Sequence, residues 1–113
     1  MRERSLLEKR PAKVATWFIA ETKPSTATCT AHVFDIHEDE QVMTIAYYNG
    51  GVRVVDLSGL AGISLGGAQI AGQGMREVGF YRFANANSWS AKTPSIDPQS
   101  GDFYLYGNDI ARG

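Results

Sequence analysis

Apolar residues along this chain fall into short runs separated by polar or glycine-containing turns, a pattern typical of β-strands. The runs are rich in β-branched and aromatic residues, which favour extended backbone. They cover residues 14–20, 33–36, 42–48, 52–57 and 77–83. Between two of them, Asn49 and Gly50 are residues that tolerate positive φ in a tight hairpin, and Gly51 allows an extra bulge residue. The pattern therefore predicts an all-β chain built from antiparallel hairpins.

Two of these runs lack the apolar and polar alternation of a sheet that has one solvated face. Residues 42–46 and 52–55 carry apolar side chains at both odd and even positions. Successive side chains of a strand point to opposite faces, so we expect both faces to be covered. The stacked blades of a β-propeller provide such an environment. A small β-sandwich is the alternative, and it would leave one face wet.

The pattern occurs a second time about 60 residues further along the chain. A gapless alignment places the polar turn 37–41 over 97–101, and the following strand 43–46 over 103–106. A typical four-stranded blade spans roughly 40 to 45 residues, and the glycine-rich segment 59–74 accounts for the excess. Repeats of this kind indicate a unit that cannot bury its faces alone.

The segment from Gly51 to Ser58, which reads GVRVVDLS, resembles the blade motif of the LVIVD repeat family of β-propellers. In that motif a Gly precedes Leu-Val-Ile-Val-Asp, and an apolar residue and Ser follow. Upstream, residues 31–36 and 45–51 look like the first two blade strands of the family. Arg53 departs from the apolar motif, which predicts that one face is less buried at this point.

The resemblance implies an antiparallel, four-stranded propeller-type blade with partial flanking blades, forming an incomplete ring. An N-terminal tail is expected at 1–12 and a partial β-propeller at 13–113, with the blade at about 31–84 and a partial blade at about 89–113. Residues 14–20 would be the outer strand of a preceding blade. The family would continue into a third strand where this chain stops. We therefore expect exposed strand edges to be paired in a homo-oligomer or by a complementary propeller fragment.

Charge and composition narrow the range of partners. The 113 residues include 11 basic and 12 acidic side chains, so the net charge of −1 provides no field that would attract nucleic acid. No apolar run approaches the roughly 18 residues of a membrane span. The first ten residues lack the apolar core of a signal peptide. Members of the resembled family often look extracytoplasmic, and the compartment of this chain stays open.

Candidate chemistry is sparse. One cluster has side chains suited to a metal ion: His32, Asp35, His37, Glu38, Asp39 and Glu40. On a continuous strand, His32 and His37 would point to opposite faces, and the acids from 38 to 40 lie in a solvated turn. We therefore expect a charged turn with a hydrogen-bonded structural histidine, and no metal, cofactor or catalytic residue. The single cysteine, Cys29, has no disulfide partner and is expected to be a small buried side chain.

Five residues at or near predicted turns are candidates for contact with a ligand or partner: His32, Tyr48, Asn49, Trp89 and Lys92. The favoured function is a non-enzymatic interaction or structural module of the propeller type. A metal-dependent, lactonase-like hydrolase of propeller fold is the main alternative, with His32 and nearby acids as metal ligands. A truncated gene product without an independent role is the third possibility.

Overall fold

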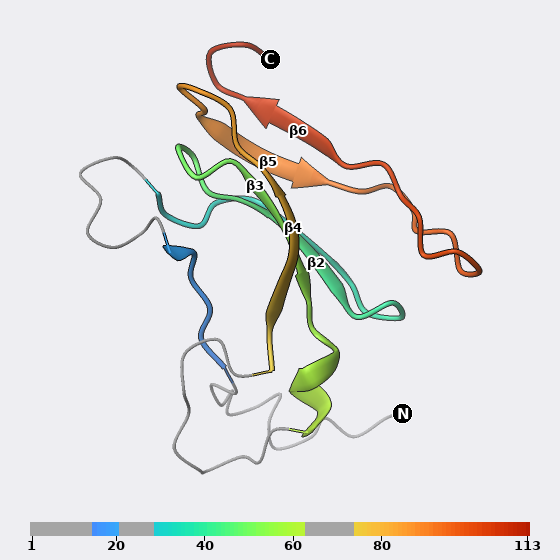
Figure 1. Cartoon of the computed structure of the whole chain (residues 1–113). Coiled ribbons are helices and arrows are strands. Elements are labelled where there is room, and N and C mark those ends of the chain that lie inside the picture. The colour runs from blue at the N-terminus through green and yellow to red at the C-terminus, as the bar shows by residue number, and fades with distance from the viewer. Residues whose placement is uncertain (1–14, 21–28, 63–73) are drawn as a thin grey trace, which may run out of the picture.

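The computed structural model describes residues 15–20, 29–62 and 74–113, which form two antiparallel sheets (Figure 1). The first sheet has four strands in the order β1-β2-β3-β4, so each strand pairs with the next one along the chain. The second sheet is the hairpin β5-β6. The elements are β1 (Phe34–His37), β2 (Val42–Ala46), β3 (Val52–Asp56), the 3-10 helix η2 (Ser58–Gly62), β4 (Arg76–Tyr81), β5 (Ser88–Lys92) and β6 (Tyr106–Asp109). The predicted all-β class is confirmed.

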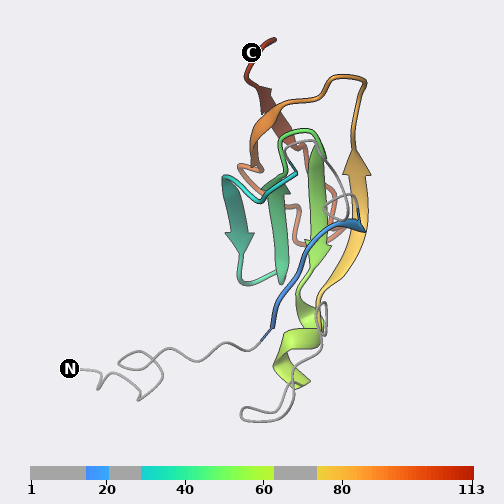
Figure 2. The same ribbon diagram turned by 90° about the vertical axis from the view of Figure 1, so that its left-hand side faces the viewer.

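Four of the predicted strands form as the hydrophobic pattern indicates, but the predicted strand at 14–20 does not. Residues 15–20 contain no strand. They lie instead across one face of the first sheet, where Ile19 is buried in the core and Trp17 packs against it (Figure 2). The apolar residues of this segment thus contribute side chains to the core and no strand to the sheet. The predicted N-terminal tail lies outside the described residues.

One face of the first sheet forms the larger core. Met43 and Ile45 of β2 lie on this face, and Met43 pairs across the ladder with Val55 of β3. These side chains are buried together with Tyr47, Cys29 and Ile19. Cys29 is therefore a small buried side chain, as the sequence indicated.

The other face of the first sheet is covered by the hairpin β5-β6 (Figure 2). Ala46, Val52 and Ala91 form a second buried cluster, against which Leu105 packs. Thr44 is fully buried on this face, and its hydroxyl donates a hydrogen bond to the Ala91 carbonyl over 2.9 Å. The central strands β2 and β3 are thus covered on both sides, which explains their lack of alternation.

Arg53 is buried, and the expectation of a less buried face at this position is wrong. Its side chain is only 3% exposed. The guanidinium donates from Nε and Nη2 to the Gly50 carbonyl, and from Nη1 to Glu77 Oε1 over 3.1 Å. It also lies 4.7 Å from the ring centroid of Phe80. A charged residue is accommodated here because its donors have partners and its stem fills an apolar site.

The turn between β2 and β3 has its positive φ angles at positions other than those predicted. They occur at Tyr48, with φ of 46°, and at Gly51, with φ of 77°, instead of at Asn49 and Gly50. The turn is closed by hydrogen bonds from the Tyr47 amide to the Gly51 carbonyl and from the Gly50 amide to the Tyr47 carbonyl. A Cβ atom on Gly51 would collide with the Tyr81 carbonyl, so this position requires glycine.

The two hairpins have tips at equivalent positions. His37 pairs with Val42 in the first hairpin, and the Asp97 amide bonds the Asp102 carbonyl over 2.9 Å in the second. These pairs coincide in the gapless alignment. The regular strand of the second hairpin begins only at Tyr106, later than the predicted 103–106. Pro94 lies on the opposing arm and lacks the N–H group that a continuous ladder would use.

Candidate functional site

Three of the five candidate residues form one aromatic cluster. His32 precedes β1, Tyr48 follows β2, and Trp89 belongs to β5. The His32 ring centroid lies 4.9 Å from that of Tyr48 and 5.8 Å from that of Trp89. The side chain of Trp89 remains 47% exposed. The cluster therefore combines a half-buried imidazole with an accessible indole where the two sheets meet.

His32 and Trp89 are joined by two hydrogen bonds. The indole Nε1–H donates to His32 Nε2 over 3.1 Å, and His32 Nδ1 lies 2.8 Å from the Trp89 carbonyl oxygen. An imidazole that accepts at Nε2 and faces a carbonyl with Nδ1 must carry its proton on Nδ1. Both ring nitrogens are thus engaged in the neutral tautomer. His32 is a hydrogen-bonded structural histidine, as expected, and a metal at Nε2 would have to displace the indole.

Tyr48 is fixed in an unusual backbone conformation by the neighbouring sheet. Its amide donates to the Ser88 carbonyl over 2.8 Å, and its carbonyl accepts from the Ser88 amide over 2.9 Å. A positive φ is uncommon for a bulky residue and costs energy that surrounding contacts must offset. This pair of bonds ties the turn after β2 to the start of β5. The ring of Tyr48 is thereby held against His32.

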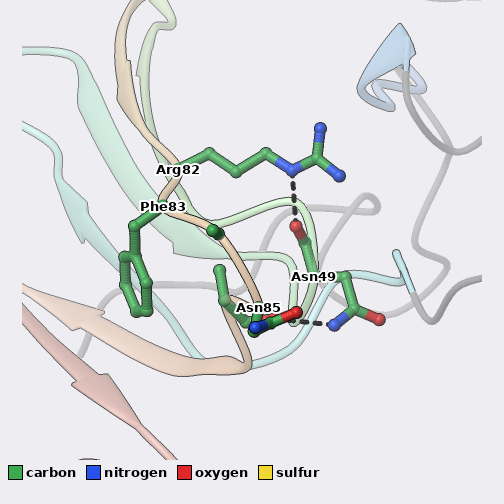
Figure 3. A pocket seen from close by; sticks show the side chains of 6 residues that line it. Asn49, Arg82, Phe83 and Asn85 are labelled. Atoms are coloured by element: carbon green, nitrogen blue, oxygen red, sulfur yellow. Dashed lines mark hydrogen bonds between the residues drawn. The ribbon is translucent and has the colours of Figure 1, made fainter.

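Asn49 lies beside the aromatic cluster in sequence but contributes to a neighbouring cavity of about 400 Å³ (Figure 3). The side-chain amide of Asn49 donates to the Ala86 carbonyl over 2.6 Å, and the backbone carbonyl of Asn49 accepts from Arg82 Nε over 2.7 Å. Phe83 and Asn85 complete the wall between them. Asn49 therefore joins the turn after β2 to the turn before β5.

Lys92 is separate from these groups. It lies at the far end of β5 from the Tyr48 turn, and its ammonium group donates to the Phe34 carbonyl over 3.0 Å. Its position on β5 and its bond to β1 fasten the two sheets together. The structure thus brings together His32, Tyr48 and Trp89, places Asn49 at an adjoining cavity, and leaves Lys92 elsewhere.

A second cavity, of about 380 Å³, was not predicted from the sequence. It lies between the ends of β3 and β4 and the edge of β6, and apolar side chains of Val52, Tyr81, Phe83 and Leu105 contribute to its wall. Arg112 lies 4.8 Å from the ring centroid of Phe83. The sequence contains no local signal for this cavity, because it depends on how the second hairpin crosses the first sheet.

Three aspartates are stabilised in the charged form by backbone amides of turns. The amide of Ser58 lowers the pKa of Asp56, and the amides of Ser100 and Gln99 lower that of Asp97. These are bonds within each residue's own turn. The pKa of Asp109 is lowered in the same way, mainly by the Asn87 amide. These carboxylates are occupied by structural hydrogen bonds.

His37 differs from these groups because its ring nitrogen Nε2 has no hydrogen-bond partner. Its Nε2 is buried and lies 3.6 Å from Asp35 Oδ2, within range of an ion pair when the ring is protonated. Two side chains do not make a metal site. Across residues 15–20, 29–62 and 74–113, no group of three His, Cys, Asp or Glu side chains is placed to hold a metal ion.

Comparisons with known proteins do not assign a function to this chain. No family model, curated protein or solved structure matches the chain. In the part of the chain that the structure describes, no helix has the length and apolar character needed to cross a bilayer.

Proposed function

We propose that this chain is a non-enzymatic interaction or structural module of the β-propeller type, related to the LVIVD repeat family. The observation that carries the proposal is the stacking of the second hairpin on the first sheet. Ala91 and Leu105 pack on Ala46 and Val52, so consecutive hairpin units meet through their faces. Propeller blades pack in this manner around their axis. The equivalent tips of the two hairpins support the same interpretation.

The exposed apolar side chains support assembly with other chains. On the edge strand β4, Val78, Phe80 and Tyr81 are 53%, 61% and 66% exposed. At the other edge of this sheet Phe34 is 51% exposed, and Tyr106 on β6 is 61% exposed. Exposed apolar side chains on edge strands can take part in interaction surfaces, and unpaired strand edges invite further pairing. We propose a homo-oligomer, or a complex with a complementary propeller fragment, formed through these edges and faces.

Light scattering after size-exclusion chromatography tests this assembly. We expect a monodisperse species with a mass that is a multiple of the chain mass, and dissociation by Phe34→Lys, which places a charge on an exposed apolar face. Glu38→Lys is the matched control, because Glu38 lies exposed in the turn after β1. A stable monomer at micromolar concentration, with no partner recovered, would contradict the proposal and favour a self-contained sandwich.

The cluster of His32, Tyr48 and Trp89, with Asn49 beside it, is the proposed contact region for a ligand or partner. Its accessible indole and fixed geometry are features of binding surfaces. Alanine substitution of Trp89 should weaken binding of an identified partner, whereas substitution of Lys92 should have a smaller effect. Unchanged affinity on replacing Trp89 would remove this region from the proposal.

The hydrolase alternative receives no support from His32. As a metal ligand, His32 would have to give up the hydrogen bond that Nε2 accepts from Trp89. Metal analysis of the purified chain checks this directly, since a lactonase-like enzyme should carry calcium or zinc at a fixed stoichiometry.

A further inference from the structure

The edge of β6 lies beside an apolar cavity, and together they form a groove bounded by Val52, Tyr81, Phe83, Leu105 and Gly107. Within the described residues, β6 pairs as a strand only with β5, and the Asp109 amide and carbonyl at its end bond Gly113. The Ile110 amide bonds the Asn87 carbonyl on the β5 side. Because the direction of backbone groups alternates along an antiparallel strand, the N–H and C=O groups of Gly107 then point away from β5 and toward the groove.

The floor of the groove extends one strand beyond β6. Val52 of β3 lies beneath Gly107, since a Cβ atom placed there would be 3.5 Å from the Val52 Cγ1 atom. Tyr81 of β4 pairs with Val52 across the ladder, so it lies one strand spacing further out, about 4.8 Å. A segment pairing with β6 would therefore cover Tyr81 and Phe83, which are exposed and half-buried. The groove is also continuous with the packed interface of Ala46, Val52 and Ala91.

The first sheet shows what kind of segment this groove accommodates. In the gapless alignment β2 corresponds to the arm that ends in β6, and β2 has β3 as its outer neighbour. Val52 and Val54 of β3 lie on the face that meets the second sheet, whereas Arg53 and Val55 lie on the opposite face. The side of β6 that corresponds to β3 is occupied by no described strand.

We propose that the groove binds one extended peptide strand in trans, antiparallel to β6, with aliphatic residues at alternate positions directed into the cavity. Main-chain hydrogen bonds to the β6 edge would provide affinity, and the cavity would select the alternating side chains. The inference rests on the proposed interaction function and names the class of its partner. It is a single strand of the β3 pattern from another polypeptide.

A second copy of the chain fits this groove less well than a single strand. Antiparallel pairing of two β6 edges requires a two-fold axis perpendicular to the sheet. Each copy would then bring its own β4 beneath the shared edge, where the β4 of its partner already lies. A single strand meets no such obstruction.

Fluorescence anisotropy with a labelled synthetic peptide tests the proposal on the full chain. The peptide carries residues 51–58, GVRVVDLS, and a scrambled peptide without alternating valines serves as its control. We expect saturable binding of the first peptide and at least about fivefold weaker binding of the second. Equal binding of the two peptides, or binding of neither, would overturn the proposal.

Two variants locate the binding site. Tyr81→Lys should weaken peptide binding about fivefold or more, because it replaces an exposed apolar wall of the groove with a charge. Val78→Lys is the matched control, since Val78 is exposed on the same strand but does not line the groove. Gly107→Pro removes the outward N–H and should weaken peptide binding about fivefold. Circular dichroism establishes that each variant is folded, and equal effects of Tyr81→Lys and Val78→Lys would refute the site.

The same samples separate this inference from the proposed function. If the chain assembles in light scattering but binds neither peptide, the proposed function stands and the strand site is wrong. If the chain forms a dimer that Tyr81→Lys and Gly107→Pro both dissolve, the occupant is a second copy, and the proposal of a peptide strand is overturned. A monomer that binds the alternating peptide supports the strand site and contradicts homo-oligomerisation.

Discussion

Arg53 provides the sharpest test of how the first sheet is stabilised. We consider Arg53→Met, which keeps a long flexible stem in the buried site but removes the guanidinium. The Gly50 carbonyl loses the donors Nε and Nη2, and Glu77 loses its bond to Nη1. The methionine does not restore the contact that the cation makes with the Phe80 ring.

The expected cost follows from these contacts. A buried carbonyl left without its donors costs about 1 to 3 kcal/mol. The ion pair with Glu77, whose side chain is 30% exposed, adds about 0.5 kcal/mol, and the cation–π contact with the largely exposed Phe80 adds about 0.5 kcal/mol. We therefore expect the free energy of unfolding to fall by about 2 to 4 kcal/mol. For a chain of this size the melting temperature would fall by about 10 to 20 °C.

Urea unfolding followed by far-ultraviolet circular dichroism measures the change, with Glu77→Gln as the matched control. The control removes only the carboxylate charge at the partly exposed end of the pair, and should cost below about 1 kcal/mol. The bond from Arg53 to the Gly50 carbonyl is thereby separated from the ion pair. If Arg53→Met loses no more stability than Glu77→Gln, the Gly50 carbonyl is not the dominant partner, and the reasoning fails.

Three further predictions concern the turns and the aromatic cluster. Gly51→Ala should cost at least about 1 to 3 kcal/mol, because its φ is positive and its Cβ would meet the backbone of β4; Gly79→Ala, with open space around the added atom, should cost less in the same urea titration. Asp109→Asn should lower the free energy of unfolding more at pH 7 than at pH 3. Because the pKa of Asp109 in the folded chain lies below its ordinary value of about 3.9, the ionised carboxylate stabilises the fold above that pH. This contribution is lost as the pH falls through the folded pKa. A stability difference from the unmodified chain that stays the same at both pH values would contradict this. His32→Ala should shift Trp89 fluorescence to longer wavelength, measured with Trp17 replaced by phenylalanine, because loss of the imidazole lets water reach the indole; an unchanged emission maximum would argue against the contact of His32 with Trp89.

The strands of the first sheet could be predicted from the sequence because neighbouring residues determine them. Val52 to Val55 are β-branched apart from Arg53, and glycines at 50 and 51 fix the preceding turn. The burial of Arg53 could not be predicted from the sequence, because one of its partners, Glu77, lies on β4 and is 24 residues away. For the same reason the strand predicted at 14–20 is wrong, because the described residues 15–20 only pack side chains on the sheet. Its apolar residues give the same sequence pattern whether its backbone pairs with a strand or only its side chains pack on the sheet.

Part of the candidate site was also anticipated, since its residues lie at predicted turns. The contact of His32 with Trp89 spans 57 residues, and it forms because β5 crosses the first sheet beside β1 and β2. Lys92 was grouped with them because it lies near a predicted turn, but the structure places it at the other end of β5. The groove beside β6 depends on that crossing alone, so no run of neighbouring residues indicates it.

The absence of a side chain at Gly50 links two distant positions of the chain. A Cβ atom at Gly50 would overlap the terminal methyl of Ile19, so the isoleucine occupies a notch that only glycine leaves open. These two positions should therefore vary together among homologous sequences. Where alanine or a larger residue stands at 50, we expect a shorter side chain at 19. Such paired substitution would trace the docking of residues 15–20 through evolution.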